Sequence, residues 1–209
     1  MELWQALVLA VIEGLTEYLP ISSTGHIILG SAVMGIHENP IVKDYTVIVQ
    51  FGAILSVLVV YRERFIQSLG TVAGAKQALL LLFVSFLPAA VIGLLFNKAI
   101  DRLLESVTTV GWTLLLGGVV LLFIDRIGKH RDNTDALKLP FKTGILIGFS
   151  QCLAMIPGIS RSGASIVGGL GLGLSRQTEA EFSFFLAVPT LTAASGYKLL
   201  KMGDLLNAE

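Results

Sequence analysis

The chain has 209 residues, of which 54% are hydrophobic and 14% charged, and its mean hydropathy is +0.77. Soluble domains carry roughly 25% charged residues, so this composition predicts an integral membrane protein. The formal net charge is zero and no basic run is present, which argues against nucleic acid as a partner.

The first apolar segment, up to about Ile36, is interrupted by the polar sequence LPISSTGH. Proline, glycine and serine in the middle of an apolar stretch release backbone polar groups. Membrane proteins tolerate such groups only inside the protein or beside a watery cavity. We therefore predict a re-entrant hairpin here, made of a helix, a polar loop and a second helix.

Two glutamates lie at the end of the first helix of this hairpin. Glu13 and Glu17 are four residues apart, so a helix places both carboxylates on one face. Two buried like charges require compensation, which a divalent cation, a shared proton or an arginine would supply. The alternative interpretation is a solvated helix face near the membrane surface.

The hairpin loop continues with hydroxyl groups and a histidine. Ser22, Ser23, Thr24 and Gly25 offer hydroxyls and free backbone N–H groups at a helix start, which suit a phosphate. Alternatively, the serines only cap the second helix. His26, close to hydroxyls and two carboxylates, is a candidate nucleophile, base or acid.

Four stretches without a charged residue approach the ~20 residues that a helix needs to cross a bilayer. They are Tyr45–Tyr61, Gln77–Asn97, Ser106–Ile124 and Phe182–Tyr197. The connecting segments 62–77, 97–105 and 125–142 carry three, two and five Lys or Arg residues. The positive-inside rule then places the first and third of these segments in the cytoplasm.

A second interrupted segment extends over residues 143–175, where IPGISRSGAS breaks the apolar sequence, and we predict a second re-entrant hairpin. Arg161 is the only Arg or Lys in this segment. Its guanidinium matches phosphate oxygens in a bidentate manner, and Ser160 and Ser162 beside it are further candidate substrate ligands. The alternative is an arginine that extends to the membrane surface.

The two hairpins resemble each other, since LTEYLPISSTGH and LAMIPGISRSGA share a pattern in which Pro20 and Pro157 lie 137 residues apart. Three spans separate the hairpins, so the predicted repeats have inverted topology and their loops meet near the midplane. We predict one all-α, polytopic membrane domain over 1–209, with repeat one at 1–124 and a partial repeat two at 143–209. Against repeat one, repeat two lacks about two C-terminal helices of ~20 residues each.

These motifs resemble a known family. EGLTEYLPISSTGHIILG, PGISRSGASIVGGL and EFSFFLAVP are similar to sequences of the bacterial undecaprenyl-diphosphate phosphatases, also called bacitracin-resistance proteins. The resemblance implies removal of the terminal phosphate of undecaprenyl diphosphate, which recycles the lipid carrier for the cell wall. It assigns the glutamate motif to Glu13 and Glu17, the serine and histidine to Ser23 and His26, and the phosphate-binding arginine to Arg161.

The resemblance also implies a divalent cation, Mg²⁺ or Ca²⁺, which Glu13 and Glu17 would bind. It implies a multi-pass protein of the bacterial cytoplasmic (inner) membrane with the site open toward the periplasmic side. Members of the family end in two further helices, as the repeat predicts. The expected partners are the polyprenyl diphosphate substrate and membrane lipids. The expected protein partner is a second copy of the chain, in a homodimer.

The residues leave two questions open. Ser23, His26 and a water molecule all fit the role of nucleophile. A lipid flippase or transporter is the alternative function, because inverted repeats with broken helices are also a transporter design. A protein that only sequesters the lipid, without turnover, is a third hypothesis.

Overall fold

The computed structural model describes residues 1–104, 106–124 and 134–206, which form helices and no strands, as predicted. The α-helices are α1 (Leu3–Thr16), α2 (Ser23–Val33), α3 (Pro40–Val60), α4 (Arg62–Leu69), α5 (Val72–Leu104), α6 (Val107–Leu122), α7 (Phe141–Gln151), α8 (Arg161–Gly171) and α9 (Arg176–Leu206). Two short 3₁₀ helices are η2 (Ala136–Lys138) and η3 (Cys152–Met155). Within the basic segment predicted at 125–142, residues 125–133 lie outside the described part.

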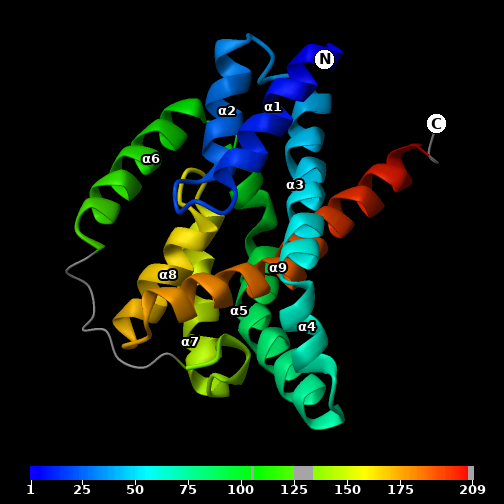
Figure 1. The fold of residues 1–209 in the computed structure, drawn as a ribbon. Coiled ribbons are helices and arrows are strands. Elements are labelled where there is room, and N and C mark those ends of the chain that lie inside the picture. The colour runs from blue at the N-terminus through cyan, green and yellow to red at the C-terminus, as the bar shows by residue number, and fades with distance from the viewer. Residues whose placement is uncertain (105, 125–133, 207–209) are drawn as a thin grey trace.

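The helix, loop, helix order of both predicted hairpins is confirmed. α1 and α2 occupy one half of the molecule, α7 and α8 the other, and the loops that connect each pair approach each other in the middle (Figure 1). Ser162 Oγ, near the start of α8, donates a hydrogen bond of 3.1 Å to the carbonyl of Leu19 in the first loop. The first loop therefore contacts the first turn of α8, directly after the second loop.

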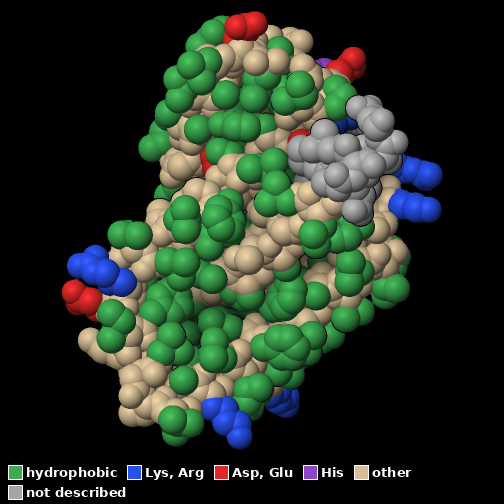
Figure 2. Space-filling model, turned by 90° about the vertical axis from the view of Figure 1, so that its right-hand side faces the viewer, with side chains coloured by type: hydrophobic (Ala, Val, Ile, Leu, Met, Phe, Trp, Pro, Cys, Tyr) green, Lys and Arg blue, Asp and Glu red, His purple; other side chains and the backbone are tan. Residues whose placement is uncertain are grey.

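The apolar helices are compatible with a membrane protein. Among the described residues, α3 with 21 residues and the first 29 residues of α5 are long and apolar enough to cross a bilayer, with mean hydropathies of 1.6 and 2.7. α6 is apolar but shorter. α9 contains the predicted span 182–197, but it is not among the helices that are both long and apolar enough to cross a bilayer. Figure 2 shows a face covered by hydrophobic side chains, with most of its charged side chains around the outline.

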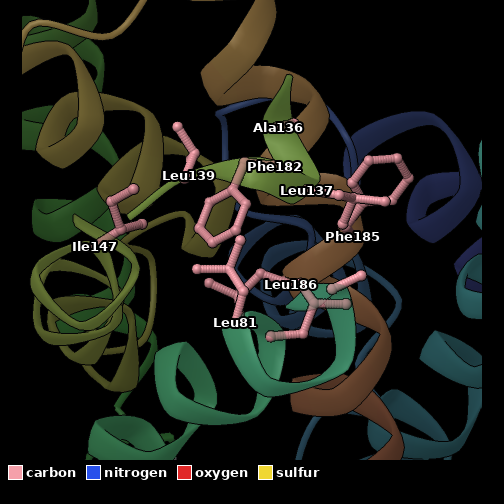
Figure 3. Close-up of a cluster of buried hydrophobic side chains, with 10 residues drawn as sticks. Leu81, Ala136, Leu137, Leu139, Ile147, Phe182, Phe185 and Leu186 are labelled. Atoms are coloured by element: carbon pink, nitrogen blue, oxygen red, sulfur yellow. The ribbon is translucent and has the colours of Figure 1, made fainter. Parts of the chain in front are cut away.

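The first half of α9 forms the main packing core with α5 and α7. Phe182, Phe185 and Leu186 are fully buried, and Phe182 points between Leu81 of α5 and Ile147 of α7 (Figure 3). Close contacts of this kind stabilise a bundle of membrane helices through van der Waals packing. The core therefore fixes the part of α9 that lies next to the second hairpin.

Two glycines, Gly144 and Gly148, let α7 approach α5 closely. A Cβ atom at Gly144 would collide with the side chains of Ser85 and Leu81, and one at Gly148 would collide with the backbone carbonyl of Ser85 and touch Pro88. Small residues four positions apart are a common way for membrane helices to pack backbone against backbone. Gln151 Nε2 adds a hydrogen bond of 3.1 Å to the Ser85 carbonyl.

Replacement of Gly148 with alanine is expected to lower the free energy of unfolding by about 1–3 kcal/mol, because the new methyl group overlaps a backbone atom that cannot move away cheaply. Thermal unfolding of the purified protein in detergent measures the change. Gly52→Ala on α3 is the matched control, since nothing lies within 4 Å of a Cβ there and alanine favours a helix. An equal loss of stability in both variants would contradict the tight α5–α7 contact.

The start of α9 is held by ion pairs. Arg64 Nε lies 2.8 Å from Glu181 Oε1, and Arg64 Nη2 lies 3.2 Å from Asp135 Oδ1. Burial raises the pKa of Asp135, but the backbone N–H of Leu137 and the charge of Arg64 outweigh it and leave the pKa below its usual value. Partly exposed pairs of this kind contribute little to stability.

Candidate active site

The first loop brings two buried glutamates to the centre of the molecule. The side chain of Glu13 is 1% exposed and neither of its carboxylate oxygens has a hydrogen-bond partner among the described residues. Glu17 follows one turn later, also buried, and accepts a hydrogen bond from Ser23 Oγ at the start of α2. Glu13 lies close enough to Glu17, Ser23 and Arg161 to interact with them electrostatically.

The second loop supplies the positive charge. Arg161 is the first residue of α8, and its Nη2 donates to Glu17 Oε1 at 3.1 Å, while its Nη1 donates to the carbonyl of Ser183 in α9 at 3.0 Å. Its Nε has no partner among the described residues. A guanidinium group is always charged, so a nearly buried one requires such partners, and the free Nε leaves one donor for a ligand.

A serine caps the second helix of each hairpin. Ser22 Oγ accepts from the N–H of Gly25 at 3.3 Å, and Ser160 Oγ accepts from the N–H of Gly163 at 3.1 Å. Ser22 therefore caps α2, as one of the two interpretations of its loop predicted, and Ser160, predicted as a substrate ligand, caps α8 in the same way. Ser22 also has φ of +67°, an uncommon conformation for a residue other than glycine, and strain of this kind costs about 1–3 kcal/mol.

His26 and Thr24 have partners of their own. His26 Nδ1 lies 2.8 Å from the carbonyl of Ser22, and because a carbonyl only accepts, this nitrogen carries the proton. Thr24 Oγ1 accepts a hydrogen bond of 3.2 Å from Gln50 of α3. Among the hydrogen bonds of the described residues, neither His26 nor Thr24 bonds Glu17 or Arg161, whereas Ser23 bonds Glu17 directly.

Several residues that hold the site were missed in the sequence. The carbonyl of Ser183 accepts a hydrogen bond from Arg161, and its hydroxyl accepts one of 2.9 Å from Ser165. Gln50 donates a hydrogen bond to Thr24. Tyr18 donates to the carbonyl of Ala53 in α3, and its ring packs edge-on against Phe184 at 5.3 Å. Gln50 and Ser183 are polar residues inside apolar stretches, a signal that marks functional positions in membrane proteins.

The donor set fits a hard cation only partly. Among the described residues, no group of three or more His, Cys, Asp or Glu side chains could hold a metal ion. Glu17 uses its two oxygens for Ser23 and Arg161, whereas both oxygens of Glu13 are free. Mg²⁺ is commonly bound by one or two carboxylates together with substrate phosphates, and Glu13 fits that arrangement.

The guanidinium of Arg161, the carboxylate of Glu17 and the hydroxyl of Ser23 form a row where the two loops meet. Arg161 binds Glu17, and Glu17 accepts from Ser23. Such a row is able to bind an anion at the guanidinium, to accept a proton at the carboxylate and to attack through the hydroxyl. It is therefore suited to transfer of a phosphoryl group.

Three known proteins that resemble this chain carry the same name, and a family model matches it. The family model described as bacitracin resistance protein BacA matches residues 6–209. The chain is similar to the undecaprenyl-diphosphatase of Bdellovibrio bacteriovorus, with 48% identity over 202 residues that cover 94% of this chain and 73% of the relative. It is also 50% identical to that of Flavobacterium psychrophilum, covering 91% and 69%, and 45% identical to that of Aromatoleum aromaticum, covering 97% and 74%.

Proposed function

The chain belongs to the bacitracin resistance protein BacA family, and on this basis we propose that it hydrolyses undecaprenyl diphosphate to undecaprenyl phosphate and inorganic phosphate. It is thus a membrane-bound acid anhydride hydrolase that recycles the lipid carrier of cell-wall synthesis and confers resistance to bacitracin. The observation that carries this proposal in the structure is the row from Arg161 through Glu17 to Ser23.

In this proposal Arg161 binds the diphosphate. Its guanidinium already lies at the loop junction, with Nε free and Nη2 on Glu17. A diphosphate offers more negative charge than one carboxylate, so we expect phosphate oxygens to replace Glu17 as the partner of Nη2. The N–H groups at the start of α2 and α8 add positive potential for the same oxygens, and the guanidinium stabilises charge on the transferred group.

Displacement of Glu17 from Arg161 makes Glu17 a stronger base beside Ser23. Ser23 Oγ then attacks the terminal phosphorus, its proton passes to Glu17, and the bond from phosphorus to the bridging oxygen breaks. Undecaprenyl phosphate leaves with the electron pair of that bond. Water next attacks the phosphoserine, and Glu17 returns its proton to Ser23 Oγ as the bond between phosphorus and Oγ breaks. Inorganic phosphate leaves with the oxygen and hydrogens of that water. His26 holds the carbonyl of Ser22 and so orients the turn that presents Ser23.

Glu13, with help from Glu17, would hold the divalent cation. When bound, this ion would neutralise negative charge on the diphosphate. The support for this assignment is the buried carboxylate of Glu13, which has no other partner among the described residues. An isolated buried carboxylate is costly, and a cation or a proton removes that cost.

Glu13→Gln is expected to raise the Mg²⁺ or Ca²⁺ concentration for half-maximal phosphate release by about tenfold or more, since one ionised ligand is lost. Titration of each cation after treatment with EDTA measures the effect. Glu38→Gln is the matched control, because the side chain of Glu38 is 90% exposed and distant in sequence from the site. Unchanged cation dependence in Glu13→Gln would remove Glu13 from the proposed cation site.

We also propose that the two hairpins are inverted repeats in the bacterial cytoplasmic membrane, with the site open to the periplasmic side. The matching serine caps, the opposed positions of α1–α2 and α7–α8, and the contact of the first loop with the start of α8 support the repeat (Figure 1). The larger number of Lys and Arg residues in the segments 62–77 and 125–142 supports the orientation.

Phosphate release from undecaprenyl diphosphate by the purified protein in detergent, with a divalent cation present, tests the proposed function. The same protein in vesicles tests the flippase alternative, which requires lipid movement without hydrolysis. Hydrolysis in detergent, where no two leaflets exist, supports the phosphatase. Lipid movement or lipid binding without any released phosphate would refute the phosphatase proposal.

A further inference from the structure

α6 contacts the loops of both hairpins through one face. The inward residues Val110, Thr113, Leu114 and Gly117 follow a helical spacing, and Val110 is fully buried. The opposite face is exposed and strictly apolar over Leu115, Leu116, Val119 and Val120. α6 packs on α2, and its contacts with α5 are weaker. The inner face of α6 is therefore directed at the loops.

On the second loop, α6 contacts the turn that precedes Arg161. The Thr113 hydroxyl lies within hydrogen-bond distance of the Pro157 carbonyl, besides two carbonyls of its own helix at 3.0 Å. The next residue, Gly158, has φ of +89°, and a Cβ there would collide with the Thr113 hydroxyl and with the Val110 carbonyl. Arg161 begins α8 only three residues later, so Thr113 holds the turn from which Arg161 projects.

On the first loop, α6 contacts the start of α2. A Cβ at Gly25 would lie 3.0 Å from Leu114 Cδ2, so the absence of a side chain at Gly25 lets the two helices come close. Gly25 follows Ser23 by two residues, and its N–H is bound by the Ser22 cap. Adjacent residues of α6, Thr113 and Leu114, thus contact the two loops that carry Arg161 and Ser23.

We propose that α6 fixes the distance between the two halves of the site, and that Thr113 is a positioning residue for Arg161 through the Pro157 carbonyl. This inference rests on the proposed function, in which Arg161 holds the diphosphate. Thr113 does not touch substrate in this proposal. Its hydroxyl sets the turn at Gly158, and the turn sets where the guanidinium meets a phosphate.

Thr113→Val keeps the shape of the side chain and removes the hydroxyl. We expect it to raise the Kd for inorganic pyrophosphate and the KM for undecaprenyl diphosphate by about tenfold, with kcat changed less than about threefold, because a shifted guanidinium weakens head-group binding. Thr113→Ser should restore both constants. Thr108→Val is the matched control on the exposed side of the same helix and should leave them unchanged.

A double variant separates positioning from general destabilisation. If Thr113 acts through Arg161, then Thr113→Val combined with Arg161→Lys should bind pyrophosphate no more weakly than Arg161→Lys alone. Additive losses, or a wild-type Kd in Thr113→Val, would overturn the proposal. If Thr113→Val does not fold, Thr113→Ala takes its place. It should likewise raise the Kd for pyrophosphate and add no further loss to Arg161→Lys.

The measurement also separates this inference from the proposed function. Pyrophosphate binding, followed by thermal shift of the protein, does not require hydrolysis. A wild-type chain that binds pyrophosphate but releases no phosphate from the lipid would refute the phosphatase proposal, and the Thr113 variants would still decide the role of α6. A wild-type chain that neither binds pyrophosphate nor hydrolyses the lipid would refute both.

Discussion

Arg161→Ala is expected to lower kcat/KM for phosphate release by about 1000-fold, because it removes the permanent positive charge that bonds Glu17 at the loop junction. Arg161→Lys should recover only part of the loss, since an ammonium group cannot donate to Glu17, Ser183 and a phosphate from the fixed positions that the guanidinium uses. Phosphate release under subsaturating substrate measures both variants. Arg62→Ala, at an exposed ion pair, is the control.

Arg161→Ala leaves the buried carboxylate of Glu17 without the guanidinium group that pairs with it. This loss by itself costs about 3–5 kcal/mol of stability. Glu17→Gln combined with Arg161→Ala removes both charges and should restore thermal stability without restoring activity. Recovery of activity in this double variant would show that Arg161 serves the fold and not the reaction.

Ser23→Ala should also reduce kcat by about 1000-fold or more, as removal of a nucleophile does in other hydrolases, with little effect on pyrophosphate binding. Ser31→Ala is the control: Ser31 lies in the same helix, is similarly buried, and its hydroxyl donates to the carbonyl of Ile28 in its own helix. A steady-state assay of the two variants gives the difference.

The same question has a direct chemical readout. Substrate labelled in its terminal phosphate, quenched within one turnover, should leave acid-stable label on the peptide that contains Ser23. Acid-labile label on the peptide with His26 would falsify the assignment of Ser23 and would favour a phosphohistidine. Absence of any protein label, with full activity in Ser23→Ala, would point to attack by water.

Much of this site could be predicted because its signals are local. Proline, glycine and serine within apolar stretches indicated both hairpins, and Arg161 was conspicuous as a lone charge in its segment. The matching pattern around Pro20 and Pro157 predicted that the loops meet. The spacing of Glu13 and Glu17 placed them on one helix face, and both carboxylates are buried.

The rest depended on tertiary contacts that a sequence does not display. Arg161 is held by the carbonyl of Ser183, and every residue carries a carbonyl, so the polar side chain of Ser183 marked the position but not its bond to Arg161. α5 continues to Leu104 although the predicted span ended at Asn97, because charged residues such as Arg102 favour helices and do not end them. The buried start of α9 has polar residues because it faces α8 and Arg64.

The acceptors around the two loops have a consequence for how this protein can vary. Ser162, Thr113, Arg161 and Tyr18 all donate to main-chain oxygens, namely those of Leu19, Pro157, Ser183 and Ala53. A main-chain oxygen survives any replacement of its own side chain. Each donor position is therefore constrained in its chemistry. Three of the acceptor positions, Leu19, Pro157 and Ala53, are constrained only in shape, whereas the Ser183 hydroxyl also accepts from Ser165. A directed-evolution library aimed at new lipid head groups is best placed on those three positions.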